Sequence, residues 1–194
     1  MEMKTTTETA RQRLRRQDCA LVVIDIQEKL LPPIHERERL VRNAQLLLRL
    51  AQILHLPIVA TTQYARGLGA VVPEIASLLS SPEVSDKLEF SCFSHHGFSG
   101  AIKDRAKNRN TLLLCGMETH ICVMQTALGA LDAGYLVHVA ADAVGSRSEF
   151  NWKIGLERMR ESGALISSTE TIIYELLGAS GTPEFKQMLP YLKQ

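Results

Sequence analysis

Short apolar segments alternate with amphipathic segments along most of the chain. The first segment, residues 19–25, is a continuous apolar run that ends in the carboxylate of Asp25. Such a run is typical of a strand that is buried on both faces of a parallel sheet. Further strands are expected at 57–62, 83–86, 111–115, 135–141 and 164–168.

Helical periodicity separates these strands. Apolar residues recur at helical spacing over residues 36–55, and Gly134 and Gly163 stand where left-handed C-terminal caps belong. Helices are therefore expected at 36–55, 73–79, 100–107, 121–133, 149–162, 170–177 and 183–192. The alternation predicts an α/β fold with a parallel sheet covered by helices on both faces.

The chain shows no internal repeat and no linker, so residues 18–194 are predicted to form a single domain. Residues 1–17 form a polar arm rich in Thr and Arg, which we interpret as a loose arm or an oligomer contact. Glu2 and Glu8 argue against a transit peptide.

Composition narrows the class of partner. Of 194 residues, 45% are apolar and 22% are charged, which is typical of a globular protein. The formal net charge of +1 gives no electrostatic reason to expect nucleic acid or an anionic membrane. No apolar run reaches the ~18 residues that a membrane span needs. We therefore expect a small-molecule substrate, with neither nucleic acid nor membrane as partner.

The four cysteines form no C-x-x-C pair, and no apolar signal segment begins the chain. This pattern favours a reducing, cytoplasmic location. Cys92 and Cys115 are interpreted as buried structural thiols.

Three reactive residues follow predicted strands, at the edge where parallel sheets bind ligands. Asp25 ends the first strand, Lys87 follows the third, and Cys122 lies after the fourth at the start of a helix. Each has an ordinary structural alternative, namely a turn carboxylate, a solvated lysine and a small buried thiol.

Together these three groups match the needs of thiol chemistry. A helix N-terminus and a nearby ammonium favour a thiolate, and a carboxylate can accept the thiol proton. Gly116 would allow a sharp turn after the strand, so that loop amides bind an oxyanion.

The segments that carry these residues resemble those of a known family. Residues 21–27 (LVVIDIQ), 86–91 (DKLEFS) and 116–123 (GMETHICV) are similar to the three blocks of the isochorismatase-like cysteine hydrolases, as are 141–147 and 159–177. The resemblance covers about residues 18–178. It implies a three-layer α/β/α fold with a six-stranded parallel sheet of order 3-2-1-4-5-6, and an Asp25–Lys87–Cys122 triad.

The resemblance also implies a non-proline cis peptide between Met117 and Glu118. The N–H groups of Glu118 and Cys122 would then form the oxyanion hole. Nicotinamidases of this family carry an Asp-x-His metal site after the second strand, whereas residues 61–66 here read TTQYAR. We therefore expect no metal and no cofactor. Residues 62–69 look closer to the isochorismatase-domain-containing proteins.

Several other residues are candidates for lining the substrate pocket, namely Gln27, Gln63, Tyr64, Phe93 and His120. His95 and His96 are adjacent, but no carboxylate–histidine cluster joins them, so a metal role is not expected.

The resulting prediction is a cysteine hydrolase that cleaves a small amide through a Cys122 thioester. Two alternatives stay open: a vinyl-ether hydrolase with Asp25 as general acid, and a catalytically idle scaffold. Apolar groups in loops 64–72 and 93–98, and Trp152 beside Phe150, further predict a homo-oligomer, at least a dimer.

Overall fold

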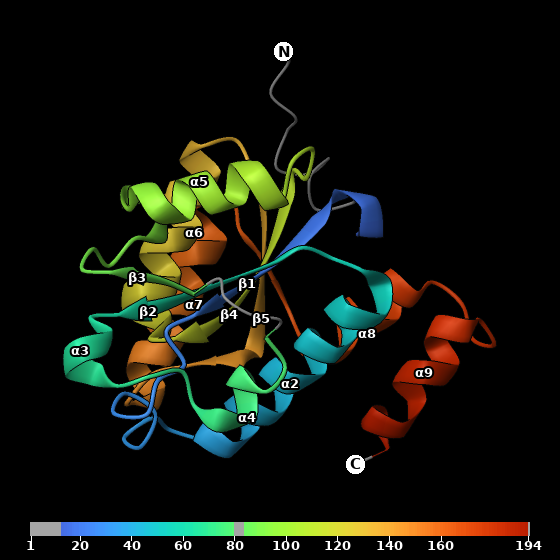
Figure 1. Ribbon diagram of the computed structural model, residues 1–194, viewed down its shortest axis with the longest axis horizontal. Coiled ribbons are helices and arrows are strands. Elements are labelled where there is room, and N and C mark those ends of the chain that lie inside the picture. The colour runs from blue at the N-terminus through green and yellow to red at the C-terminus, as the bar shows by residue number, and fades with distance from the viewer. Residues whose placement is uncertain (1–12, 80–83, 194) are drawn as a thin grey trace.

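The computed structural model describes residues 13–79 and 84–193. Its centre is one six-stranded parallel sheet of order β3-β2-β1-β4-β5-β6, which confirms the predicted fold class (Figure 1). The strands are β1 (Cys19–Ile24), β2 (Ile58–Gln63), β3 (Val84–Lys87), β4 (Thr111–Met117), β5 (Leu136–Gly145) and β6 (Leu165–Ser167).

Helices cover both faces of this sheet. One face packs against α2 (Arg37–Leu54), α4 (Pro73–Ala76), α8 (Thr169–Leu177) and α9 (Pro183–Leu192). The other face packs against α5 (His96–Arg105), α6 (Met124–Asp132) and α7 (Glu149–Glu161). Short helical turns complete the order: η1 (Arg16–Asp18), α3 (Ala65–Leu68), η2 (Cys92–Ser94) and η3 (Thr119–Val123).

Strand β1 is buried on both faces, as its continuous apolar run predicted. All six of its residues are buried, with Leu21 and Val23 facing one helical layer and Val22 and Ile24 facing the other. Because β1 lies between β2 and β4, its carboxyl end meets those of both neighbours. Asp25 follows at this central position.

Two strands are longer than predicted. Strand β4 continues through Gly116 to Met117, and β5 continues to Gly145 past the polar residue Asp142. The Asp142 carboxylate accepts hydrogen bonds from the Thr169 N–H (2.7 Å) and the Thr169 hydroxyl (2.8 Å). It thus serves the first turn of α8, which explains a carboxylate within a strand.

Two helices differ from their predicted extents. Helix α5 begins at His96 rather than residue 100, because Phe98 is fully buried in the core despite two nearby glycines. Tertiary packing therefore outweighs the low helix propensity of this segment. Helix α4 ends at Ala76, and the turn α3 was not predicted.

The predicted N-terminal arm lies partly outside the described residues. Of its last five residues, Leu14 is buried against the core and its N–H donates to the Glu175 carboxylate at 2.9 Å. This part of the arm is docked on α8 rather than loose. None of the helices in the described part of the chain combines the length and apolarity that a membrane span requires.

Gly116 lies at the closest approach of β1 and β4. Its φ is +120°, and a Cβ built there would lie 2.0 Å from the carbonyl oxygen of Ile24. The predicted sharp turn at Gly116 is therefore wrong. Gly116 remains in the strand and lets the backbone of β4 pass beside the end of β1.

This close approach predicts that Gly116→Ala destabilises the protein by about 1–3 kcal/mol, through overpacking and an unfavourable φ. Urea denaturation measures the loss. Gly100→Ala is the matched control, because a Cβ at Gly100 meets nothing within 4 Å. Equal stability of the two variants would contradict the close-packing interpretation.

Candidate active site

A buried ion pair joins the ends of β1 and β3. The Lys87 Nζ donates to Asp25 Oδ2 at 2.6 Å, and neither side chain is exposed to solvent. Lys87 is the last residue of β3 rather than a residue after it. Strand β2 lies between the two, so the lysine side chain reaches past it to the carboxylate.

A second contact fixes the lysine. The Nζ also donates to Gln63 Oε1 at 2.8 Å, and Gln63 Nε2 donates to the carbonyl of Leu88 at 2.8 Å. Burial alone would lower the pKa of the Lys87 ammonium. The charge of Asp25, its hydrogen bond and the smaller contributions of Cys92 and Cys122 together outweigh this effect, so the pKa of Lys87 lies above its usual value. The lysine therefore remains a cation inside the protein.

The other oxygen of Asp25 is also occupied. Thr61, near the end of β2, donates its hydroxyl to Asp25 Oδ1 at 2.7 Å. Asp25 itself adopts a φ of +52°, in the left-handed region, as the chain turns away from β1. Two donors and the lysine charge compensate for burying this carboxylate.

Cys122 completes the group. It lies in the π-helical turn η3, directly before α6, and only 6% of it is exposed. Burial raises the pKa of its thiol far above the usual value, and the charge of Asp25 and a hydrogen bond to it raise the pKa further. The charge of Lys87 acts in the opposite direction and lowers it.

The resting state of Cys122 is therefore a neutral thiol. The sequence predicted that the helix end and Lys87 favour a thiolate, and the charge of Lys87 does act in that direction. Desolvation and the charge of Asp25 outweigh the effect of Lys87, because a thiolate buried beside a carboxylate is unfavourable. The thiol can react as a nucleophile only if its proton leaves, and the Asp25 carboxylate is the adjacent hydrogen-bond acceptor.

The peptide bond between Met117 and Glu118 is cis. The Glu118 carbonyl accepts hydrogen bonds from the N–H groups of Ile121 (3.0 Å) and Val123 (3.2 Å). The Glu118 carboxylate accepts from the Arg147 N–H (3.0 Å) and guanidinium. These bonds tie the turn that carries Cys122 to the end of β5.

The two glutamines predicted to line the pocket, Gln27 and Gln63, are buried, and their amides are engaged within the protein. Gln27 is fully buried. Its amide donates to the carbonyls of Gln63 and Gly69 and accepts from the Gln63 N–H. It thereby fixes the segment after β2. Gln63 is 9% exposed, and its amide is engaged by Lys87 and Leu88.

The other pocket candidates are more scattered. Tyr64 is exposed and packs its ring beside Gly67. Phe93 is half-buried. Its ring centroid lies 5.4 Å from that of Phe98 and 5.7 Å from that of Tyr135, so it belongs to an aromatic cluster beside α6. His120 Nδ1 lies 2.9 Å from the Ser146 hydroxyl.

Sequence reasoning missed Thr61 as a site residue and the nearness of Cys92. A threonine in a buried strand gives no signal by itself. The useful signal is position, because Thr61 pairs with Ile24, the residue before Asp25, in the register of β1 and β2. Cys92 is buried, as predicted, and its thiol lies 3.8 Å from the Thr61 hydroxyl.

The segment after β2 is where the nicotinamidases of the family carry their metal site. In the described ranges 13–79 and 84–193, no three His, Cys, Asp or Glu side chains come together as metal ligands would. His95 Nδ1 contacts the Glu89 carboxylate at 3.3 Å, while His96 is exposed. Gln63 faces Lys87, and a cation beside that ammonium would be repelled.

With this geometry established, the comparisons with known proteins decide the family. The sequence model of the isochorismatase domain family matches residues 19–171 of this chain. The chain belongs to the isochorismatase family.

Relatives of this isochorismatase-family chain span most of its length. It is 38% identical over 177 residues to the secreted isochorismatase effector Isc1 of Phytophthora sojae, covering 90% of this chain and 84% of that protein. It is 37% identical to isochorismatase domain-containing protein 2 of Bos taurus, covering 90% and 82%.

Solved structures share the fold. A structure described as the MAR1 ribonuclease from Caenorhabditis elegans is 32% identical, with a TM-score of 0.87 over 94% of this chain and 93% of that one. The Escherichia coli YcaC gene product, described as an octameric hydrolase of unknown specificity, is 26% identical, with a TM-score of 0.84 and 93% coverage of both.

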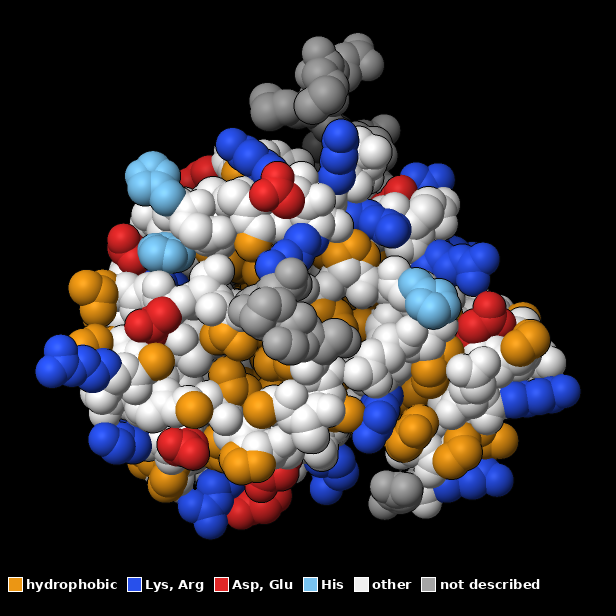
Figure 2. Space-filling view, in the orientation of Figure 1, with side chains coloured by type: hydrophobic (Ala, Val, Ile, Leu, Met, Phe, Trp, Pro, Cys, Tyr) orange, Lys and Arg blue, Asp and Glu red, His pale blue; other side chains and the backbone are white. Residues whose placement is uncertain are grey.

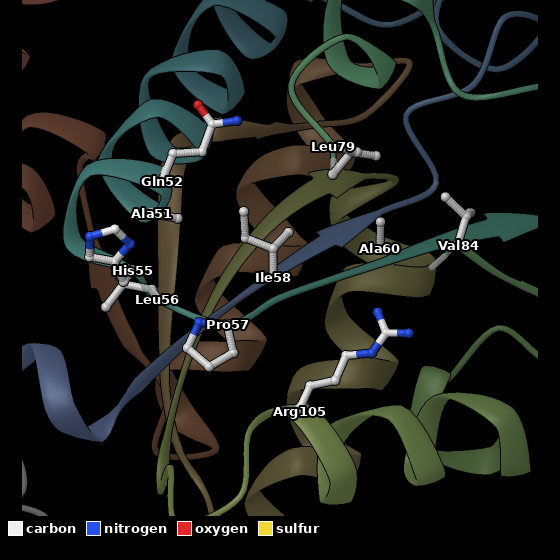
Figure 3. Close-up of a pocket in the computed structure, with 10 residues that line it drawn as sticks. All are labelled: Ala51, Gln52, His55, Leu56, Pro57, Ile58, Ala60, Leu79, Val84 and Arg105. Carbon is white, nitrogen blue, oxygen red and sulfur yellow. The ribbon is translucent and has the colours of Figure 1, made fainter. Parts of the chain in front are cut away.

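A pocket of about 630 Å³ lies elsewhere in this isochorismatase-family structure (Figure 3). It is at the amino end of β2, where Pro57 and Ile58 line it together with His55 and Arg105. The candidate active site is at the opposite end of the same strand, beside Gln63. None of Asp25, Lys87 and Cys122 lines this pocket.

Proposed function

We propose that the protein is a cysteine hydrolase that cleaves the C–N bond of a small amide through a Cys122 thioester. The observation that carries this proposal is that the Cys122 thiol lies beside the Asp25 carboxylate, which also accepts hydrogen bonds from Lys87 (2.6 Å) and Thr61 (2.7 Å). A nucleophile, a base and an orienting cation thus meet at one edge of the sheet.

The first half of the proposed reaction forms the thioester. Asp25 takes the thiol proton as the Cys122 sulfur attacks the substrate carbonyl carbon. The N–H groups of Glu118 and Cys122 are proposed to hold the resulting oxyanion. The C–N bond then breaks, and Asp25 passes its proton to the leaving amine.

The second half releases the acid. Asp25 removes a proton from a water molecule, which attacks the thioester carbonyl. The C–S bond breaks, and the sulfur regains the proton from Asp25. Lys87 keeps its charge throughout and offsets the negative charge that moves between Asp25 and Cys122.

A substrate panel tests the proposal. The purified protein is incubated with small amides, vinyl ethers and RNA, and trapped intermediates are sought by intact mass spectrometry. An acyl adduct on Cys122 with an amide supports the cysteine hydrolase. Vinyl-ether turnover that survives Cys122→Ala supports Asp25 as a general acid instead. A Cys122 thiol that resists every electrophile supports an idle scaffold.

We also propose a homo-oligomer, at least a dimer. Supporting it are the exposed apolar side chains of Leu88 (72%), Phe90 (53%) and Phe150 (71%), and the octameric state that the YcaC description gives. The apolar groups first expected at an interface are mostly used within the subunit, since Phe98 is fully buried and Val72 is 5% exposed.

Light scattering is expected to report a mass at least twice that of the 21.6 kDa chain. Phe150→Ser serves as a probe of the exposed apolar surface, and a shift towards smaller species is expected. A stable monomer of the parent protein at micromolar concentration would contradict the proposal.

The proposed partners and location follow the same reasoning. Figure 2 shows basic and acidic side chains interspersed on one face, which suits a small-molecule substrate better than a polyanion. All four cysteines are free and buried, which suits the cytoplasmic location that we propose. Cell fractionation tests the location, and recovery from the secreted fraction would contradict it.

A further inference from the structure

The hydroxyl group of Thr61 lies between the Asp25 carboxylate and the Cys92 thiol. It is 1% exposed and donates to Asp25 Oδ1 at 2.7 Å. On its other side, the Cys92 Sγ lies 3.8 Å from the same hydroxyl oxygen. Thr61 thus joins the thiol of Cys92 to the carboxylate of Asp25 in one hydrogen-bonded chain.

The direction of this chain is determined by chemistry. An ionised carboxylate can only accept hydrogen bonds, so the Thr61 hydroxyl must be the donor to Asp25. Its oxygen then accepts from the Cys92 S–H. Burial raises the pKa of Cys92 to about 11, so this group stays a protonated thiol at neutral pH and remains a donor.

This chain of hydrogen bonds fixes the Oδ1 atom of the Asp25 carboxylate. Oδ1 accepts from Thr61, while Oδ2 accepts from Lys87 at 2.6 Å. With a donor on each oxygen, the carboxylate cannot rotate without losing a bond inside a dry site. The lone pairs that remain are those available to the thiol of Cys122.

We propose that Thr61 is a positioning residue for the catalytic base: it orients the Asp25 carboxylate and offsets part of its charge, and so controls how readily Cys122 reacts. This inference rests on the proposed function, in which Asp25 accepts the thiol proton. Without the Thr61 donor, the Asp25 carboxylate is no longer fixed towards the thiol, so proton transfer from Cys122 is less well aligned and slower.

Strand β2 supplies a matched control. Thr62 is the next residue, is 4% exposed and donates its hydroxyl to the Asp86 carboxylate at 2.9 Å. Successive side chains of a strand face opposite sides of the sheet, so Thr62 points away from Asp25. Each threonine therefore loses the same kind of bond on conversion to Val, but only Thr61 touches the site.

The experiment compares the pH profile of Cys122 alkylation by iodoacetamide, located by peptide mass spectrometry. Thr61→Val is expected to react roughly three- to tenfold more slowly at each pH below the midpoint, the effect of losing one hydrogen bond of typical net strength. Thr62→Val is expected to match the parent protein, and Thr61→Ser to restore the parent profile. Identical profiles for Thr61→Val and Thr62→Val would overturn the inference.

Two further measurements keep the test decisive. If Thr61→Val fails to fold, Thr61→Cys replaces it, since a weak S–H donor should give a rate between those of Thr61→Ser and a variant with no donor. A Thr61→Cys rate equal to that of Thr61→Ser would then count against the inference.

In a crystal structure of the folded variant lacking the hydroxyl, the Asp25 carboxylate is expected to turn relative to Lys87, and an unchanged carboxylate would also overturn the inference. Neither result requires amide turnover, so absence of hydrolysis by the parent protein contradicts the proposed function alone.

Discussion

Cys122→Ala is expected to abolish amide hydrolysis while leaving the fold intact. The Cys122 thiol lies beside the Asp25 carboxylate, and alanine cannot form the thioester. Loss of a covalent nucleophile typically costs several orders of magnitude in kcat. Activity is measured on whichever amide the panel identifies, and folding by circular dichroism.

The control is a second buried thiol outside the site. Cys115 in β4 is fully buried and its Sγ lies 3.7 Å from the carbonyl oxygen of Val22. Cys115→Ala should lose some stability through a small cavity, yet keep its activity. Full turnover in Cys122→Ala would show that the covalent mechanism is wrong.

Lys87→Met is expected to destabilise the protein by about 3–5 kcal/mol, because it leaves the Asp25 carboxylate buried without its cation. Urea denaturation measures this loss. The double variant Asp25→Asn, Lys87→Met should recover part of it, since no uncompensated charge then remains. In the single variant, Cys122 should also alkylate more slowly, because the charge of Lys87 lowers the pKa of that thiol.

An exposed pair provides the control. Lys153 contacts Glu149 at 2.7 Å with 62% and 57% of the two side chains exposed. Lys153→Met should cost no more than about 1 kcal/mol, since solvent screens such pairs. Similar losses for Lys87→Met and Lys153→Met would refute a strong buried pair.

The buried pair also makes a prediction about alkaline pH. The pKa of Lys87 is raised by folding above its usual 10.5, so the folded state holds the proton more tightly than the unfolded state. Its contribution to stability is fully present below pH 10.5 and is lost as pH rises through the folded-state value. Lys87→Met should lack this alkaline loss, which urea titrations at increasing pH measure.

Much of the fold could be predicted from local patterns. The apolar run before Asp25 and the helical stripe of α2 are local in sequence, and burial of each requires only the matching periodicity. The three reactive residues could be assigned to one edge because parallel strands share their carboxyl ends. Their proposed roles as a triad came from the resemblance of the surrounding blocks.

The tertiary structure decided what each of those groups contacts. Asp25 and Lys87 are 62 residues apart in the chain, and only the strand order brings them to 2.6 Å. The burial of Gln27 and the role of Thr61 depend on which side chains face inward at a strand end, and residue type does not reveal this.

The protonation of Cys122 shows the same division most clearly. The sequence determined that a thiol stands at a helix start after a strand and near a carboxylate and an ammonium. Whether that thiol is ionised depends on the balance between desolvation and the charges of Asp25 and Lys87. That balance is set by burial from every surrounding element, so only the folded chain determined it, and it favoured the neutral thiol.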